Sequence, residues 1–269
     1  MQQKSQIWIA VGVIVVLLGL ALVARQMVAR QSDVEDVSAL LESGKAKLES
    51  GDYEGAIADL ESVIETTPDN SEAHFLLGQA YNHTGDLFKA EEEFRKVLEL
   101  NPDNAAAHHN LGVTYFQLQD PEAALNEFQA ALKLDPDDPD THYQLGATYL
   151  VLALPATDPM APPDEQKLEQ AVTQFEAALE LKPNMPESLI GLGNVYIQQG
   201  NYTDAIETLK KALEQVPDSP QAYYALGEAY ARNGDTAEAC AAYQHFLDLN
   251  PPADWQAQGQ QVMTALGCQ

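Results

Sequence analysis

The stretch SEAHFLLGQAYNHTGDLFKAEEEFRKVLELNPDN, residues 71–104, decides the fold of this chain of 269 residues. Each of its halves carries apolar residues at helical spacing, as Phe94 and Val97 do in the second half. Between the halves, Gly85-Asp86 supplies a residue that tolerates positive φ, followed by a helix cap. The pattern predicts two helices that are joined as a hairpin.

The same pattern returns along the chain at a fixed period. A proline follows each second segment, and four of the five intervals between these prolines are 34 residues, whereas the fifth is 47. The long interval therefore contains an insertion of 13 residues. One hairpin cannot bury its apolar face alone, so neighbouring repeats must stack. The six repeats defined in this way are Val37–Asn70, Ser71–Asn104, Ala105–Asp138, Pro139–Met185, Pro186–Ser219 and Pro220–Ala253.

Further positions recur in all six repeats. The eighth residue is always glycine: Gly44, Gly78, Gly112, Gly146, Gly193 and Gly227. The second helix has a large apolar residue four positions after an alanine: Leu60, Phe94, Phe128, Phe175, Leu209 and Tyr243. These spacings resemble those of the tetratricopeptide repeat family over residues 37–253. The resemblance implies an all-α fold, a right-handed α-solenoid of six helix hairpins that offers a surface for binding other proteins.

The two ends of the array and its insertion differ from the repeats. Residues 254–269 are expected to form a capping helix, because apolar Trp255 is followed by polar and apolar residues in helical alternation. The first repeat departs most from the pattern, with Ser43 and Lys47, which suits an end position. The Pro-rich insertion, at about 153–165, predicts a first helix prolonged through Leu154 and a second helix that starts at Asp164. Two interpretations of the insertion are open, a contact for a partner and a loop packed on its neighbours.

The N-terminal part contains an uncharged apolar segment at residues 7–24, between a short tail (1–6) and a linker (25–36). Eighteen helical residues at ~1.5 Å each span roughly 27 Å, close to the thickness of a bilayer core. A cleaved signal peptide is disfavoured because its apolar region has about 7–15 residues. Lipid attachment is disfavoured because no cysteine lies nearby, and no repeat needs a further core helix. The segment therefore predicts a single transmembrane helix as an N-terminal anchor.

The net charge of the chain limits which kinds of molecule it can bind. The chain has 41 acidic and 14 basic residues, a net charge of −27, and every acidic residue follows residue 32. Such a field repels nucleic acid and anionic lipid headgroups, so we expect no nucleic-acid partner. The excess of acidic residues can also be explained by the need to keep a long, exposed solenoid soluble.

The resemblance places a binding groove on the first helices of the repeats. The predicted groove residues are Phe75, Gln79, Asn82, His109, Phe116, Tyr143, Leu150, Ile190, Asn194, Ile197, Tyr224 and Arg232. They suit an extended or helical segment of another protein, and the alternative is that several only pack helices together. Family members that hold a chaperone's C-terminal carboxylate do so with Lys, Asn and Arg at the fifth and ninth positions. Among the corresponding residues of the first three repeats only Lys45 is basic, so we expect no carboxylate-clamp ligand.

The cysteines allow two interpretations. Cys240 lies near the start of the last repeat's second helix and Cys268 at the end of the capping helix. If the two helices run antiparallel, these residues come within about a helical turn of each other. In the first, they form a disulfide that holds the cap, which implies an oxidising compartment. In the second, Cys240 is a small buried residue and Cys268 is a free terminal thiol. The histidines at the fourth position, His74, His108 and His142, are interpreted as packing residues, and no metal or cofactor is expected.

No catalytic motif occurs in the sequence, so we expect no enzyme activity. The sequence predicts a single-pass membrane protein whose repeats bind proteins or peptides and support a membrane complex. Alternatives are an ancillary subunit of an enzyme, a secretion system or a cytochrome-maturation system, and a self-assembling structural protein. Charges flanking residues 7–24 do not fix the orientation. The cysteine pair and the resemblance to bacterial signal-anchored repeat proteins favour an extracytoplasmic domain, and a cytoplasmic one is the alternative.

Overall fold

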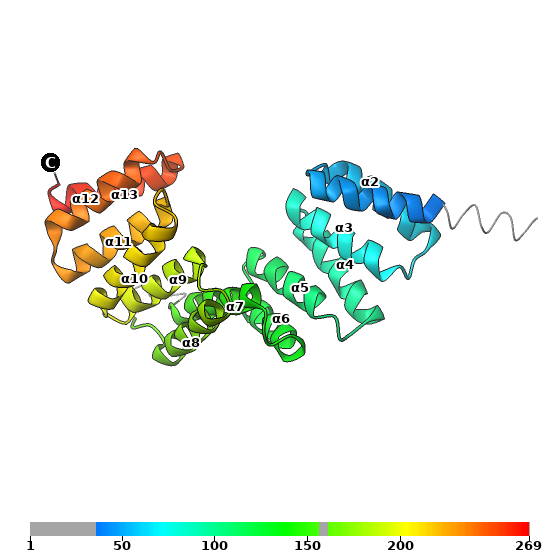
Figure 1. Cartoon of the computed structure of the whole chain (residues 1–269), viewed down its shortest axis with the longest axis horizontal. Coiled ribbons are helices and arrows are strands. Elements are labelled where there is room, and N and C mark those ends of the chain that lie inside the picture. The colour runs from blue at the N-terminus through cyan, green and yellow to red at the C-terminus, as the bar shows by residue number, and fades with distance from the viewer. Residues whose placement is uncertain (1–35, 156–160, 269) are drawn as a thin grey trace, which may run out of the picture. The chain divides into compact units, whose positions relative to one another are not determined.

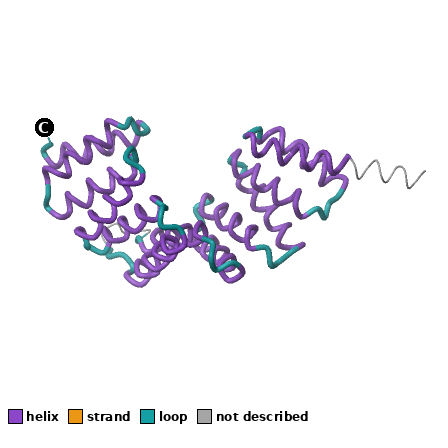
Figure 2. Tube along the Cα trace, in the orientation of Figure 1, coloured by secondary structure: helices purple, strands orange, loops and turns teal. Residues whose placement is uncertain are grey.

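The computed structural model describes residues 36–155 and 161–268. Within these ranges every regular element is a helix and turns join the helices, which confirms the all-α prediction (Figure 2). The apolar segment 7–24 lies outside the described residues. Among the residues that are described, no helix combines the length and apolar character needed to cross a bilayer.

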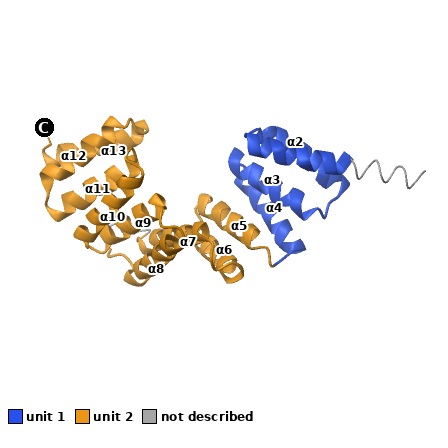
Figure 3. Cartoon of the chain, viewed as in Figure 1, with its two compact units in different colours: residues 1–102 blue, residues 103–269 orange. Residues whose placement is uncertain are grey.

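The chain divides into two compact units, residues 1–102 and 103–269 (Figure 3). In unit 1, residues 36–50 are helical and are followed by α2 (Tyr53–Thr66), α3 (Ser71–Thr84) and α4 (Leu87–Leu100). Helix α3 packs against both α2 and α4.

Within its described residues, unit 2 contains three hairpins of regular length, a fourth that is interrupted by the insertion, and a terminal helix (Figure 1). Each hairpin packs on the next, and α13 packs on α12. The hairpins are α5 (Ala105–Gln117) with α6 (Pro121–Leu134), α7 (Pro139–Ala153) with α8 (Glu165–Leu181), α9 (Pro186–Gln198) with α10 (Tyr202–Gln215), and α11 (Pro220–Asn233) with α12 (Thr236–Asp248). The terminal helix is α13 (Ala253–Leu266), at the position predicted for the cap.

The recurrent glycine lets the two helices of a hairpin approach closely. A Cβ at Gly112 of α5 would lie 2.7 Å from Cε1 of Phe128 on α6, nearer than real Cβ atoms come to another atom. Phe128 is fully buried, so the aromatic ring occupies the space that a side chain at position 112 would take. The recurrent glycine and the large apolar residue of the second helix therefore pack together, and this contact is repeated in every hairpin.

Turns between repeats start the next helix through a side-chain cap. The side chains of Asn70, Asn104 and Ser219 accept hydrogen bonds from backbone N–H groups three residues on. The turns inside the hairpins follow this rule less regularly. Asp52 accepts from the N–H of Gly55, whereas Asp86 occupies the predicted N-cap position of α4 without a side-chain bond to the helix. The residue before it, Gly85, has a left-handed backbone conformation.

A backbone hydrogen bond joins the two ends of the insertion. Helix α7 ends at Ala153, one residue before the predicted end, and Leu154 is its C-cap. The N–H of Asp164 donates to the carbonyl of Ala153 at 2.8 Å, and the Asp164 carboxylate caps α8 through the N–H groups of Gln166 and Lys167. The second helix thus starts where the sequence predicts.

Candidate functional site

The first helices of the repeats in unit 2 build one wall. Helix α9 contacts both α7 and α11 in addition to its hairpin partner α10. Residues on the same face of these helices are spaced at three and four positions, so side chains from successive repeats line up. Any hollow on this wall is therefore lined by equivalent positions of neighbouring repeats.

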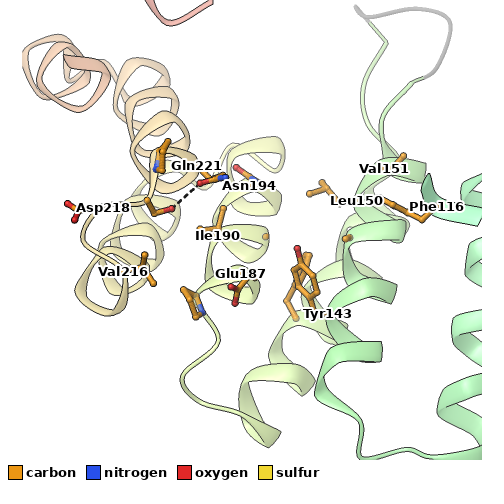
Figure 4. A pocket seen from close by; sticks show the side chains of 16 residues that line it. Phe116, Tyr143, Leu150, Val151, Glu187, Ile190, Asn194, Val216, Asp218 and Gln221 are labelled. Carbon is orange, nitrogen blue, oxygen red and sulfur yellow. Dashed lines mark hydrogen bonds between the residues drawn. The ribbon is translucent and has the colours of Figure 1, made fainter. Parts of the chain in front are cut away.

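A cavity of about 530 Å³ opens between α7 and α9 and is lined mainly by apolar side chains. In Figure 4, Leu150 of α7 faces Ile190 of α9 across the hollow, which Val151 also lines. Its volume falls within the ~300–1,000 Å³ that small-molecule sites occupy. Five of the predicted groove residues line it: Phe116, Tyr143, Leu150, Ile190 and Asn194.

A second hollow, of about 380 Å³, continues the first toward the C-terminus. The two share four lining residues: Leu150, Ile190, Asn194 and Gln221. The continuation adds Leu154, Tyr224, Glu228 and Trp255. We call the two hollows together the unit-2 groove. It runs along α7, α9 and α11, includes Phe116 of α5, and reaches the capping helix.

The floor of the groove is the ring of Phe175. This side chain is 1% exposed and lies 6.1 Å from the ring of Tyr143, centroid to centroid. Gly191 of α9 permits this arrangement, because a Cβ there would come within 2.5 Å of Cε1 and Cζ of Phe175. The absence of a side chain at position 191 keeps the apolar floor open between α7 and α9.

The rim of the groove is acidic. Glu187 and Asp218 line the first hollow, both are exposed, and neither forms an ion pair with another described residue. Burial raises the pKa of the Tyr143 hydroxyl, and the neighbouring Glu187 carboxylate raises it further. Glu228 in the second hollow pairs with Arg232 at 2.9 Å. No described residue that lines either hollow is Lys, Arg or His.

The capping helix closes the C-terminal end of the groove. The ring of Tyr224 lies within 5.6 Å of Trp255 and 5.2 Å of Phe246, and Trp255 packs on Phe246 at 5.1 Å. Cys240 of α12 and Cys268 are joined by a disulfide, with their Cα atoms 5.6 Å apart. The bond ties the C-terminal end of the cap to the last hairpin, while the ring contacts hold Trp255 at the groove.

Two predicted groove residues have other surroundings. Ile197 is 1% exposed and packs in a core cluster with Ala225 and Ala229, so its assignment to the groove is wrong: the small residues of α11 let the two helices cover it. Arg232 does not line either hollow and pairs with Glu228 instead.

His109 lies at a separate small hollow of about 160 Å³. Its Nδ1 donates to the hydroxyl of Thr141 at 2.6 Å, and that hydroxyl donates to the Asp138 carboxylate. Burial lowers the pKa of the His109 imidazole, and Asp138 opposes the change. The side chain therefore supports the turn between α6 and α7.

The remaining three predicted residues, Phe75, Gln79 and Asn82, belong to α3 of unit 1. There Phe75 packs edge-on against Phe94, with ring centroids 5.8 Å apart. Their part in binding remains a prediction.

The predicted set of groove residues does not include several residues that complete the groove: Ala147, Val151, Gly191, Gln221 and Trp255. Val151 carries a signal that could have found it, since it is apolar and directly follows Leu150 in the predicted helix extension. Its side chain is 46% exposed.

The recurring histidines are structural. His74 has Nδ1 at 2.5 Å from Glu93 and Nε2 at 2.8 Å from the carbonyl of Pro68, and His142 contacts Gln174 and the carbonyl of Pro136 in the same way. Each ring joins its helix to the turn before it and to the second helix. Among the residues that the structure describes, no three side chains of His, Cys, Asp or Glu gather as metal ligands.

Comparisons with known proteins agree with this architecture. Residues 47–112 and 164–211 match a family profile described as tetratricopeptide repeat. Residues 114–151 and 193–234 match one described as TPR repeat, and residues 220–253 match a further tetratricopeptide repeat profile. A comparison with curated proteins gave no match.

Solved structures share the fold. The MamA protein is 26% identical, with a TM-score of 0.57 over 67% of this chain and 92% of its own. The pilF protein of Pseudomonas aeruginosa is 20% identical, with a TM-score of 0.68 over 87% of this chain and 99% of its own. YrrB, described as a TPR protein with an unusual peptide-binding site, is 20% identical, with a TM-score of 0.56 over 75% of this chain and 97% of its own.

Proposed function

We propose that this chain, which is built of tetratricopeptide repeats, binds a segment of another protein in the unit-2 groove and holds that partner at a membrane. The coarser part of this statement, a repeat scaffold for protein–protein interaction, follows from the family and the fold. We further propose that the groove is the binding site, that the chain lies at a membrane, and that it catalyses no reaction.

One observation carries the choice of site. The groove is a continuous, apolar hollow whose walls come from three rigid helices and whose floor is a buried ring. Apolar side chains of a bound segment would lose water there, while the amides of Asn194 and Gln221 could orient its backbone. YrrB, which shares the fold, offers a precedent for a peptide site in such a solenoid.

The membrane part of the proposal rests on residues 7–24, whose composition and length suit a single spanning helix. The disulfide between Cys240 and Cys268 supports placing the repeats in an oxidising compartment, outside the cytoplasm. Site-directed labelling of a cysteine placed in the repeats, in intact and in permeabilised cells, tests that orientation.

The binding proposal is tested with the full chain in nanodiscs of zwitterionic lipid. A display library of random 12-residue peptides is selected on the chain after removal of peptides that bind empty nanodiscs. Each selected peptide is then measured against L150S/V151S, which removes apolar lining from the groove without adding charge. The control is L134S/L181S, because both leucines are exposed (39% and 42%, against 46% for Val151) and line no part of the groove.

We expect selected peptides to lose at least tenfold in affinity for L150S/V151S and to bind the control as they bind the wild type. Circular dichroism of both variants checks that the helices persist. Selected peptides that bind all three proteins equally would refute the groove as the binding site. Light scattering of the nanodiscs reveals self-association, which would support the structural alternative instead.

A further inference from the structure

We propose that the partner segment of the unit-2 groove is cationic: apolar side chains fill the hollow, and lysine or arginine residues beside them lie at Glu187 and Asp218. This inference rests on the proposed function and adds the chemistry of the partner to it. It follows from the distribution of charge around the groove.

The groove combines an apolar interior with carboxylates that have no cation of their own. Glu187 lies at the start of α9 and Asp218 in the turn before α11, and both line the first hollow. Neither carboxylate takes part in an ion pair within the described residues, and no basic side chain lines the hollow. The charge at the edge of the hollow is therefore uncompensated.

A bound segment would change the solvation of these carboxylates. Any apolar segment that fills the hollow removes water from its edge, and taking water from a carboxylate without supplying a partner is unfavourable. A lysine or arginine in the segment supplies that partner through a charge-assisted hydrogen bond. An acidic residue in the same place would add repulsion between like charges. The edge thus discriminates by charge among segments that fit the hollow equally well.

The charge of the whole chain acts in the same direction. With a net charge of −27, the chain attracts cationic segments from a distance and repels anionic ones. Charges at the rim of an interface mainly affect the association rate and its dependence on salt. Both the long-range and the local field therefore favour a basic, partly apolar segment of another protein.

The experiment continues from the peptide selection on the full chain in zwitterionic nanodiscs. The first readout is the composition of peptides whose binding requires Leu150 and Val151. We expect lysine and arginine to be enriched next to apolar residues in them, and aspartate and glutamate to be depleted. The second readout is the association rate of one selected peptide at about 50 mM and about 300 mM salt, where the Debye length shortens from roughly 14 to 6 Å.

The variant E187Q/D218N removes the two carboxylates of the edge. The control E169Q/E180Q removes two exposed carboxylates of α8 that do not line the groove, so that both variants have the same net charge. We expect the basic peptide to bind E187Q/D218N with about 3- to 10-fold lower affinity than the wild type at low salt. This range corresponds to the loss of exposed ion pairs. The affinity for E187Q/D218N should then depend less on salt than that for the control.

The outcomes separate the two proposals. Groove-dependent peptides without basic residues, or an equal loss in E187Q/D218N and E169Q/E180Q, would overturn the cationic partner and leave the groove's function standing. A selection that yields no peptide dependent on Leu150 and Val151 would overturn both proposals. Enrichment of basic residues, together with a loss confined to E187Q/D218N, supports both.

Discussion

Gln119 in the third hairpin adopts the left-handed backbone conformation that Gly85 adopts in the second. Their φ angles are 62° and 83°, and both residues lie directly before the aspartate that precedes the next helix. Gly51, Gly200 and Gly234 take the same conformation in other hairpins. A side chain makes this conformation unfavourable by roughly 1–2 kcal/mol, whereas glycine adopts it freely.

Replacing Gln119 by glycine should therefore stabilise the protein by about 1 kcal/mol. For a chain of this size, that corresponds to a rise of about 2–4 °C in Tm, measured by circular dichroism. The control is Gln117→Gly at the last position of α5, where the backbone is helical and glycine should lower Tm. A fall in Tm for both variants would show that Gln119 contributes contacts that outweigh its backbone conformation.

The disulfide between Cys240 and Cys268 should contribute strongly to the stability of the cap. On the chain-entropy account, a crosslink that closes 28 residues contributes roughly 3–4 kcal/mol. We expect Cys268→Ser and reduction of the wild type to lower Tm to the same extent. The C240S/C268S variant should not respond to the reductant, which separates the loss of this bond from general effects of the reagent.

The movement of the cap can be observed directly. The chain has two tryptophans, Trp8 and Trp255, so a Trp8→Phe background leaves Trp255 as the reporter. In the oxidised protein this indole packs on Phe246 and Tyr224. Reduction should shift its emission to longer wavelength as the cap separates from α12. Unchanged emission after complete reduction would show that packing alone holds the cap.

Ser43 and Lys47 of the first repeat stand where the other repeats have leucine and tyrosine, and both contact Asp59. Asp59 of α2 accepts hydrogen bonds from Lys47 Nζ at 2.7 Å and from Ser43 Oγ at 2.6 Å. These two donors hold the pKa of the Asp59 carboxyl below its usual 3.8. A carboxyl with a lowered pKa in the folded state stabilises the protein above its unfolded pKa, and this contribution is lost as the pH falls below about 3.8.

Asp59→Asn should destabilise this region by about 1 kcal/mol at pH 7, because a partly exposed ion pair and its hydrogen bonds contribute modestly. Hydrogen exchange of peptides from residues 36–66 measures the loss locally. The difference between wild type and variant should shrink as the pH falls from about 5 to about 2.5. Glu49→Gln, at an exposed carboxylate of the same region, is the control and should change little. A difference that stays constant with pH would exclude the ionised Asp59 as its source.

The repeats were predictable because their signals are local and recur. Gly112 and Phe128 lie at fixed positions within one 34-residue period, and their contact is a property of a single hairpin. The same holds for the caps at Asn70 and Asn104, each of which bonds within its own turn. Such features depend on residues that are close in sequence, so pattern reasoning can find them.

The groove was only partly predictable because it depends on neighbours from other repeats. Leu150 and Ile197 occupy the same position of their repeats, yet Leu150 lines the groove and Ile197 is buried. The difference comes from the next first helix along the chain: α11 presents Ala225 and Ala229 to Ile197, whereas the groove lies open beside Leu150. Position within a repeat predicts which face a residue occupies, and the size of the residues opposite decides whether that face stays open.

Gly191 illustrates a residue that acts outside the repeat pattern, and it provides a test of the groove's floor. The ring of Phe175 lies between two glycines: a Cβ at Gly146 would come within 3.0 Å of it and a Cβ at Gly191 within 2.5 Å. The ring is almost fully buried and lines the first hollow, so the groove is the side toward which it can be displaced. A methyl group at position 191 therefore has to displace the floor of the groove.

Gly191→Ala should lower the free energy of unfolding by about 1–2 kcal/mol. Overpacking costs roughly 1–3 kcal/mol, which exceeds the stability gained because alanine favours the helix more than glycine does. The substitution should also lower the affinity of peptides that bind in the groove. The double variant G191A/F175L should recover part of both losses, because leucine already fills the equivalent place at Leu60 and Leu209. Asn194→Ala, on the same helix, is the control that removes a groove amide without overpacking and should affect binding alone. If Gly191→Ala were as stable as the wild type and bound the peptides unchanged, the Phe175 ring would not form a rigid floor for the partner.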